Sequence, residues 1–303
     1  MATAELTLRA DRRRIGEDVV KGALAVCALI SVATTVGIVV ALFAPAFEFL
    51  RGVPLIDFLT GREWAPLFEP AHFGVLPLIA GTLLVTAIAS VVAMPLGLGA
   101  AIYLSEYAGH RARGFLKPAL EMLAGIPTIV FGYFALTFVT PLLRDLGIQV
   151  DIFNTLSAGL VMGVMLMPTV ASLSEDALGA VPRDLRDGAY ALGSTRVQVA
   201  TRIAVPAAVS GIVASFVLAI SRAVGETMIV LIAMGQQPNL TFDPREAAEA
   251  MTAFIAATGA GDVPTGSIEY KTIFAVGALL FVLTLAMNVV AIRLVRRYRE
   301  VYE

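Results

Sequence analysis

The chain has 303 residues, of which 58% are hydrophobic and 15% are charged, and its mean hydropathy is +0.82. A soluble domain carries roughly a quarter of charged residues, so this composition excludes an ordinary soluble protein and indicates a membrane protein. The formal net charge of −2 favours no class of partner. The single cysteine, Cys27, excludes an internal disulfide bond, and His72 and His110 are too far apart to give a zinc motif.

Six segments are long and apolar enough to span a membrane, since a helix needs about 20 residues to cross the hydrocarbon core. In chain order they are Val19–Ala44, Val75–Leu104, Ala119–Leu142, Leu156–Ser172, Ile203–Met234 and Thr272–Val295. The first follows Arg12, Arg13 and Arg14, as in a signal sequence, but it is too long for one and has no evident cleavage site. We interpret it as an uncleaved first span. The sequence therefore predicts an all-α membrane protein with six transmembrane helices.

The lysines and arginines lie mainly on one side of these spans. Sixteen belong to the N-terminal tail, the second and fourth loops and the C-terminal tail, whereas four lie on the opposite side: Arg51, Arg62, Arg144 and Arg245. Because positive residues concentrate in cytoplasmic loops, both termini are predicted to be cytoplasmic.

Three spans contain proline or glycine within their apolar sequence, at Met94-Pro95, Gly125-Ile126-Pro127-Thr128 and Met167-Pro168. We expect each to interrupt its helix. Broken backbone at membrane depth is tolerated where protein or a water-filled path satisfies the freed amides. A bundle around a translocation path would account for the breaks, and proline kinks repaired by neighbouring helices are the alternative.

Residues 174–206, between the fourth and fifth spans, are predicted to form two short cytoplasmic helices. Pro182 can open the first helix, whose apolar positions recur at helical spacing: Leu185, Ala189 and Leu192. Gly193 can end it in the left-handed conformation, and Ser194 can cap a second helix that runs toward Ile203. An apolar stripe on a cytoplasmic loop suggests docking into a groove of another protein.

This loop resembles the EAA loop of ATP-binding cassette (ABC) importer permeases, which reads Glu-Ala-Ala, three residues, Gly, nine residues, Ile, any residue, Leu-Pro. The spacing matches, with Asp187 for Glu, Gly188 for Ala and Val205 for Leu. Gly188 should weaken the first helix by up to about 1 kcal/mol relative to Ala. In that family the loop contacts the ATPase subunits. The resemblance implies that role for Asp187, Gly188, Ala189, Leu192, Gly193, Ile203 and Pro206, and an ordinary amphipathic surface loop is the alternative.

The chain contains no G-x-x-x-x-G-K-[ST] sequence, so it cannot hold ATP phosphates by a P-loop. The energy for transport must then come from a partner. We therefore expect a non-catalytic permease that contains no cofactor or metal, with ATP and Mg bound by its partners.

The fifth predicted span contains two charges, Arg222 and Glu226, each of which costs at least about 2.5–3.5 kcal/mol at mid-bilayer. Four residues apart, they are predicted to share a helix face and to pair. Arg222 can hold two phosphate oxygens, whereas Glu226 would position or release it. With Ser221, Gly225 and Thr227 they form the candidate substrate pathway, and a purely structural salt bridge is the alternative.

The segment Arg222–Met228 resembles the fifth-span signature of phosphate importer permeases. Ser172–Leu178 with Val181-Pro182 is similar to the stretch before their coupling loop. Further stretches are similar to the PstC-type subunit: Gly61–Pro66, Phe73–Pro77, Gly81-Thr82, Pro95–Gly97 and Leu104–Tyr107. The resemblance implies a type I ABC importer permease bundle in the cell inner membrane. It also implies four partners besides lipid, and no nucleic acid: a homologous PstA-type permease, two ATPase subunits and an external phosphate-binding protein.

Several polar residues outside this segment have two interpretations. Trp64, in the first outer loop, either contacts the binding protein or anchors at the bilayer interface. The last outer loop, 235–270, is acidic and is expected to be helical around 245–257; it either contacts the binding protein or forms a solvated face. Five threonines either line the path or bond their own backbone: Thr82, Thr86, Thr128, Thr169 and Thr227.

The domain organisation follows from these assignments. Residues 1–17 form a cytoplasmic tail, 18–74 the first transmembrane helix and a periplasmic loop, 75–296 the importer transmembrane domain, and 297–303 a cytoplasmic tail. Two other functions remain: a permease of the same fold for sulfate or molybdate, and an ATPase-independent secondary transporter. The two-helix loop disfavours the latter.

Overall fold

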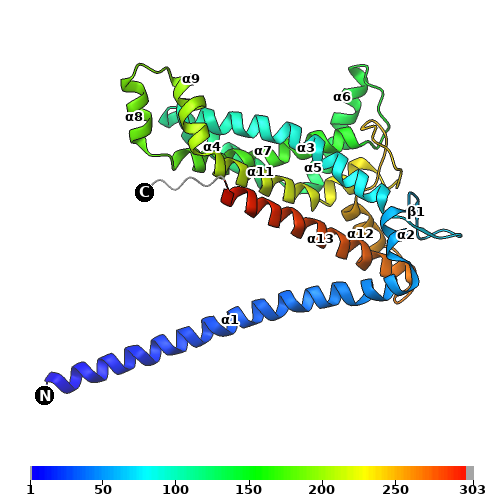
Figure 1. Ribbon diagram of the computed structural model, residues 1–303, viewed down its shortest axis with the longest axis horizontal. Helices are drawn as coiled ribbons and strands as arrows, with labels where there is room; N and C mark the ends of the chain where they lie inside the picture. The colour runs from blue at the N-terminus through cyan, green and yellow to red at the C-terminus, as the bar shows by residue number, and fades with distance from the viewer. Residues whose placement is uncertain (1, 298–303) are drawn as a thin grey trace.

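The computed structural model describes the backbone of residues 2–297 and the side-chain surroundings of residues 17–293. Most of the expected tail 297–303, and the side chains of the N-terminal arginines, lie outside these residues. The fold is an elongated helical bundle from which α1 splays away (Figure 1). Its longest helices are α1 (Ala2–Gly52), α3 (Leu76–Ile102), α7 (Thr155–Gly179), α11 (Val209–Val224) and α13 (Ile268–Arg297).

Shorter helices connect or extend these. They are α2 (Leu55–Thr60), α4 (His110–Ala124), α5 (Thr128–Phe134), α6 (Thr140–Asp145), α8 (Arg183–Ala191), α9 (Arg196–Val199), α10 (Val205–Ala207) and α12 (Met251–Gly259). Four π-helical segments continue them: η1 (Tyr103–Tyr107), η2 (Ala135–Val139), η3 (Ala200–Ala204) and η4 (Val230–Met234). Helices α8 and α9 lie at the same end of the bundle as the start of α1 and the end of α13 (Figure 1). We call this the inner end, and the end with α2 and α12 the outer end.

Among the described residues, four helices are long and apolar enough to cross a membrane, and up to six spans result if each of two bent pairs counts as one. The four are Glu17–Gly52, Leu76–Tyr107, Thr155–Gly179 and Ile268–Arg293. The bent pairs are His110–Ala124 with Thr128–Asp145, at 88°, and Arg196–Ala207 with Val209–Val224, at 72°.

The three expected breaks have different outcomes. The break at Gly125–Thr128 is confirmed, because α4 ends at Ala124 and α5 begins at Thr128 at a sharp angle. The other two expectations are wrong, since Pro95 lies inside continuous α3 and Pro168 inside continuous α7. One proline removes a single backbone hydrogen bond, and a well-packed helix can absorb that loss.

Helices α3 and α7 form the centre of the bundle because glycines let their backbones approach closely. A Cβ atom on Gly97 would lie 2.6 Å from Cβ of Val170, and one on Gly163 would lie 2.6 Å from Cβ of Val92. Both distances are shorter than real Cβ contacts. The surrounding core is made of small and apolar side chains such as Ala89 and Met162. At each position the valine side chain of one helix therefore packs directly on the glycine of the other helix, with no room for a second side chain.

The outer end departs from the all-α expectation. Two short antiparallel strands, β1 (Trp64–Ala65) and β2 (His72–Phe73), form a hairpin between α2 and α3. Trp64 is only 3% exposed and packs edge-on against Phe58 and Phe254. The interpretation of Trp64 as an anchor at the bilayer interface is therefore wrong: its ring belongs to the protein core.

The α3–α7 contact gives a prediction with a matched control in the same helix. Gly97→Ala should destabilise the chain by about 1–3 kcal/mol, because overpacking forces neighbouring backbone and Val170 apart. Gly99→Ala should leave stability unchanged or raise it by up to about 1 kcal/mol, since Gly99 has open space around it. Thermal unfolding of the purified chain in detergent measures both, and equal effects of the two variants would contradict the close packing.

Candidate functional site

Arg222 lies in the last turn of α11. It is 13 residues from the start of the helix at Val209, which places it about 20 Å from that point. The side chain is exposed, and its Nη1 atom donates a hydrogen bond to Thr169 Oγ1 of α7 at 3.1 Å. The guanidinium is thus bound by a neutral hydroxyl group of the neighbouring helix.

Glu226 does not pair with Arg222, and the prediction that it would is wrong. Helix α11 ends at Val224, so the two residues are not on one continuous helix face. Glu226 Oε1 instead accepts hydrogen bonds from the backbone N–H groups of Met228 at 3.0 Å and Ile229 at 3.3 Å. The carboxylate caps the helical segment that leads into η4, and Thr252 Oγ1 donates to the Glu226 carbonyl at 2.6 Å.

The remaining predicted pathway residues gather at this same break. Ser221 Oγ donates to Asn288 Oδ1 of α13 at 2.8 Å, and Thr227 Oγ1 donates to the carbonyl of Gly225 at 3.3 Å. Among the other threonines that could line a path, Thr82 donates within α3 and accepts the N–H of Met251, which is a structural role. The fifth predicted span is therefore interrupted where its polar residues lie.

An inner cavity of about 210 Å³ adjoins Thr169 and contains charged groups that the sequence reasoning did not single out. It is lined by Lys117 and Glu121 of α4 and by Thr169, Ser172 and Glu175 of α7. The Glu175 side chain is fully buried, and its two oxygens bind Arg113 and Lys117 of α4, the latter at 2.7 Å. The sequence feature that could have indicated this cluster is Glu175, one helical turn after Ser172, together with the basic residues of the second loop. Only the fold shows that these residues lie close together.

The two predicted helices between the fourth and fifth spans are present, and the turn between them is left-handed. Gly193 has φ +81°, a conformation that non-glycine residues rarely adopt, and it follows α8 directly. Two details differ from the prediction. Pro182 precedes α8 as its cap residue, and Thr195 rather than Ser194 caps α9, because Thr195 forms a reciprocal capping box with Gln198.

This elbow, residues 183–206, exposes part of the predicted apolar stripe. Leu192 is 89% exposed and Leu185 is partly exposed, whereas Ala189 is buried against the rest of the fold. Tyr190 and Val197 add further exposed apolar surface. Of the other predicted docking residues, Asp187, Gly188, Gly193 and Pro206 are exposed and Ile203 is half-buried.

Arg186 fastens α8 to the inner ends of two long helices. Its guanidinium donates to Glu106 Oε1 of η1, with Nη2 at 2.9 Å and Nε at 3.2 Å. It also donates to the carbonyls of Leu178 in α7 and Val181, both at 2.7 Å. The Glu106 side chain is 6% exposed, so the pair is well shielded from solvent. A displacement of α8 is therefore passed directly to α3 and α7.

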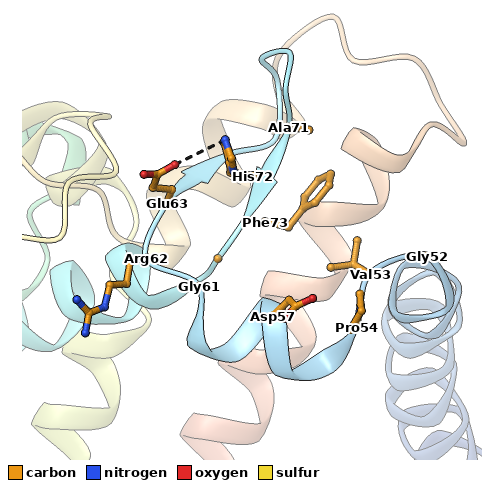
Figure 2. Close-up of a pocket in the computed structure, with 11 residues that line it drawn as sticks. Gly52, Val53, Pro54, Asp57, Gly61, Arg62, Glu63, Ala71, His72 and Phe73 are labelled. Carbon is orange, nitrogen blue, oxygen red and sulfur yellow. Dashed lines mark ion pairs between the residues drawn. The ribbon is translucent and has the colours of Figure 1, made fainter.

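The outer surface has a separate hollow of about 520 Å³ beside the β1–β2 hairpin. Figure 2 shows its residues: His72 and Glu63 face each other across the hairpin, 3.6 Å apart, while Arg62 points away from them. None of its lining residues belongs to α7 or α11, so it does not adjoin Arg222.

The Arg186 contacts lead to a prediction about local stability. Arg186→Ala leaves buried Glu106 and two carbonyl groups without their donor, which costs about 1–3 kcal/mol per unsatisfied group. Amide hydrogen exchange of residues 183–191 should therefore accelerate by roughly tenfold or more. Arg183→Ala, at an exposed position of the same helix, should leave exchange unchanged. Unaltered exchange in the Arg186 variant would refute this anchoring role.

Comparisons with known proteins agree with this geometry. The family model described as "Binding-protein-dependent transport system inner membrane component" matches residues 93–300. A probable ABC transporter permease protein, YqgH of Bacillus subtilis, is 35% identical over 271 residues, covering 88% of this chain and 87% of the relative. The phosphate transport system permease protein PstC of Mesorhizobium japonicum is 32% identical, covering 84% of this chain and 82% of the relative.

Solved structures share the fold at low sequence identity. A chain from a bacterial ABC transporter involved in the import of the acidic polysaccharide alginate has a TM-score of 0.64 and 16% identity, covering 95% of this chain and 100% of the other. A chain of the inward-facing MetNI methionine ABC transporter has a TM-score of 0.57 and 19% identity, covering 75% of this chain and 95% of the other. From the family match and the full-length relatives, the chain belongs to the inner membrane components of binding-protein-dependent transport systems.

Proposed function

We propose that this chain is the PstC-type permease subunit of an ATP-driven importer and that it translocates inorganic phosphate. The observation that carries the proposal is the state of Arg222. Its guanidinium is exposed and bound to the Thr169 hydroxyl, and no carboxylate of the described residues lies within salt-bridge distance of it. Because the Arg222 guanidinium is planar and no carboxylate neutralises its charge, it can donate two hydrogen bonds to a pair of phosphate oxygens.

The similarity to named phosphate permeases supports the same substrate. Besides the Mesorhizobium protein, the PstC proteins of Xylella fastidiosa and Haemophilus influenzae are 32% identical over 87% and 75% of this chain. The residues we assign to the substrate pathway are Arg222, Glu226, Ser221, Gly225 and Thr227. Glu226 acts in this proposal by holding the helix break open rather than by pairing with Arg222.

The proposed arrangement in the membrane has six spans with both termini in the cytoplasm. The count of six takes each bent pair as one span, and the orientation rests on the positive residues of the inner loops. It keeps the expected boundaries: tail 1–17, first helix and periplasmic loop 18–74, transmembrane domain 75–296 and tail 297–303. The elbow then faces the cytoplasm and the β1–β2 hairpin faces outward.

The proposed partners are a homologous PstA-type permease, two ATPase subunits and an external phosphate-binding protein. The exposed apolar side chains of the elbow support a docking role toward the ATPase. A transporter with the same fold, that for alginate, has been crystallised in complex with a pentasaccharide-bound periplasmic protein. The chain itself is proposed to be non-catalytic, with ATP hydrolysed by its partners.

The pathway assignment predicts the effect of removing the charge of Arg222. Arg222→Ala should lower phosphate uptake by roughly 100-fold, since a lost charge-assisted contact costs about 1.5–3 kcal/mol. Arg62→Ala, whose side chain lies at the outer hollow, should retain uptake. Uptake is measured in proteoliposomes containing the assembled transporter, and co-purification checks assembly. Normal uptake by an assembled Arg222→Ala transporter would show that Arg222 is not part of the substrate pathway. If sulfate or molybdate, rather than phosphate, stimulated ATP hydrolysis, that anion would be the substrate.

The docking assignment predicts uncoupling when the elbow is distorted. Gly193→Pro cannot adopt φ +81°, because proline fixes φ near −65°, so the elbow must change shape. We expect phosphate uptake to be lost while ATP hydrolysis continues. Gly188→Ala, at a helical position with open space around it, should keep full uptake and strengthen α8. The ratio of phosphate transported to ATP hydrolysed distinguishes the variants, and a wild-type ratio in Gly193→Pro would contradict docking through the elbow.

A further inference from the structure

The outer end contains a second cavity, distinct from the hollow beside the hairpin, with unusual polar groups in its wall. Its volume is about 440 Å³, and it lies between the β1 segment, the chain after η4, and α12 with the residues that follow it. The residues that matter for its chemistry are Trp64, Phe68, Gln236, Glu249, Phe254 and Asp262. We call it the outer cavity.

Glu249 is the principal group of this wall. The residue is 5% exposed, yet its carboxyl group makes no hydrogen bond or ion pair with any described residue. Burial alone raises the pKa of Glu249 to about 7. The carboxyl oxygens are not fully enclosed, since the enclosed unpaired atoms of the described residues are Trp64 Nε1 and Thr86 Oγ1. The carboxyl oxygens reach the cavity that Glu249 lines, where an entering group can bind them.

The backbone of the Glu249 segment is held against α3 and η4. A Cβ atom on Gly81 of α3 would lie 2.3 Å from the Glu249 carbonyl oxygen, so the segment packs directly on that helix. The N–H of Ala248 donates to Met234 at 3.3 Å, and that of Met251 donates to Thr82 Oγ1 at 3.0 Å. The site is therefore preorganised rather than formed by a mobile loop.

Trp64 supplies a second group without a partner. Its indole Nε1 is buried and has no hydrogen-bond acceptor among the described residues. The ring also packs edge-on against Phe254, with centroids 4.9 Å apart. Aromatic rings beside a carboxylate favour cations, which gain from both the charge and the ring faces.

The charges that line the outer cavity have one sign. Its two ionisable residues are Glu249 and Asp262, and no lysine, arginine or histidine lines it. Helices α3 and α12 and segment η4, which pack against the Glu249 segment, contain no charged residue. Exposed Leu67 and Phe68 form part of its rim, an apolar border that a docked protein would cover.

We infer that the outer cavity receives a lysine or arginine side chain of the external binding protein, with the Glu249 carboxylate as its partner. This inference rests on the proposed function, in which the hairpin end faces outward and such a protein docks there. The volume exceeds that of one side chain, so a short loop enters with it and packs against the exposed rim residues Leu67 and Phe68.

Binding between the assembled transporter in nanodiscs and the phosphate-loaded binding protein tests the inference. At pH 8 the Glu249 carboxyl is ionised and attracts a cation, whereas at pH 6 it is protonated, so wild-type docking should weaken by roughly tenfold on acidification. Glu249→Gln should dock as weakly at pH 8 as the wild type does at pH 6. Glu246→Gln, at an exposed position three residues earlier, should behave like the wild type.

Two further measurements keep the result interpretable. Trp64 is the only tryptophan of the chain, so an unchanged emission spectrum of purified Glu249→Gln shows that the cavity still folds. Replacing each surface lysine and arginine of the binding protein by alanine should reveal one whose loss is not additive with Glu249→Gln. Docking that Glu249→Gln leaves unaffected overturns the inference but not the proposed function. Failure of the binding protein to dock on the wild-type transporter overturns both.

Discussion

The interaction on which the proposed substrate pathway depends is the cap that Glu226 forms on its own backbone. A helix interrupted within the membrane leaves N–H groups that hydrocarbon cannot satisfy. The Glu226 carboxylate accepts two of them, and Thr252 donates to the adjacent carbonyl from α12. The break is thereby stable without any salt bridge to Arg222. The arginine, freed from its nearest carboxylate in sequence, keeps its charge available beside Thr169.

At the inner end, the small exposed elbow is connected rigidly to the long helices. Arg186 makes this connection with donors directed at one carboxylate and two carbonyl oxygens. A planar guanidinium can satisfy these acceptors together, which the point charge of a lysine could not do with the same geometry. Glu175 repeats this pattern between α7 and α4, with Arg113 and Lys117 as its partners. Each buried carboxylate joins helices that the sequence separates by many residues.

Much of the architecture could be predicted from the sequence because it depends on local rules. Apolar length located the four long helices that could cross a membrane, and the left-handed requirement at Gly193 located the elbow. The wrong predictions at Pro95, Pro168 and the Arg222–Glu226 pair share a cause. Each assumed that one residue or one spacing decides the backbone. Pro95 and Pro168 lie inside helices that stay continuous in the packed α3–α7 pair, whereas Glu226 binds its own following backbone after α11 has ended. Trp64 was misplaced for the same reason, since its burial depends on Phe254, far along the chain.

The glycine-mediated contact of α3 and α7 has a mechanical consequence. Val170 and Val92 each pack into the space that a glycine of the opposite helix leaves open, so sliding α3 along α7 would push a valine against the neighbouring side chains. We therefore expect these two helices to move together. Any alternation between an outward-open and an inward-open form then has to be taken up elsewhere. The available joints are the breaks at Gly125–Pro127 and Gly225, where α4 and α11 end, and the 72° bend at Ala208. The protein thus combines one rigid helix pair, α3 with α7, with three places where the chain can bend. Arg222 lies three residues before the last of these places, Gly225.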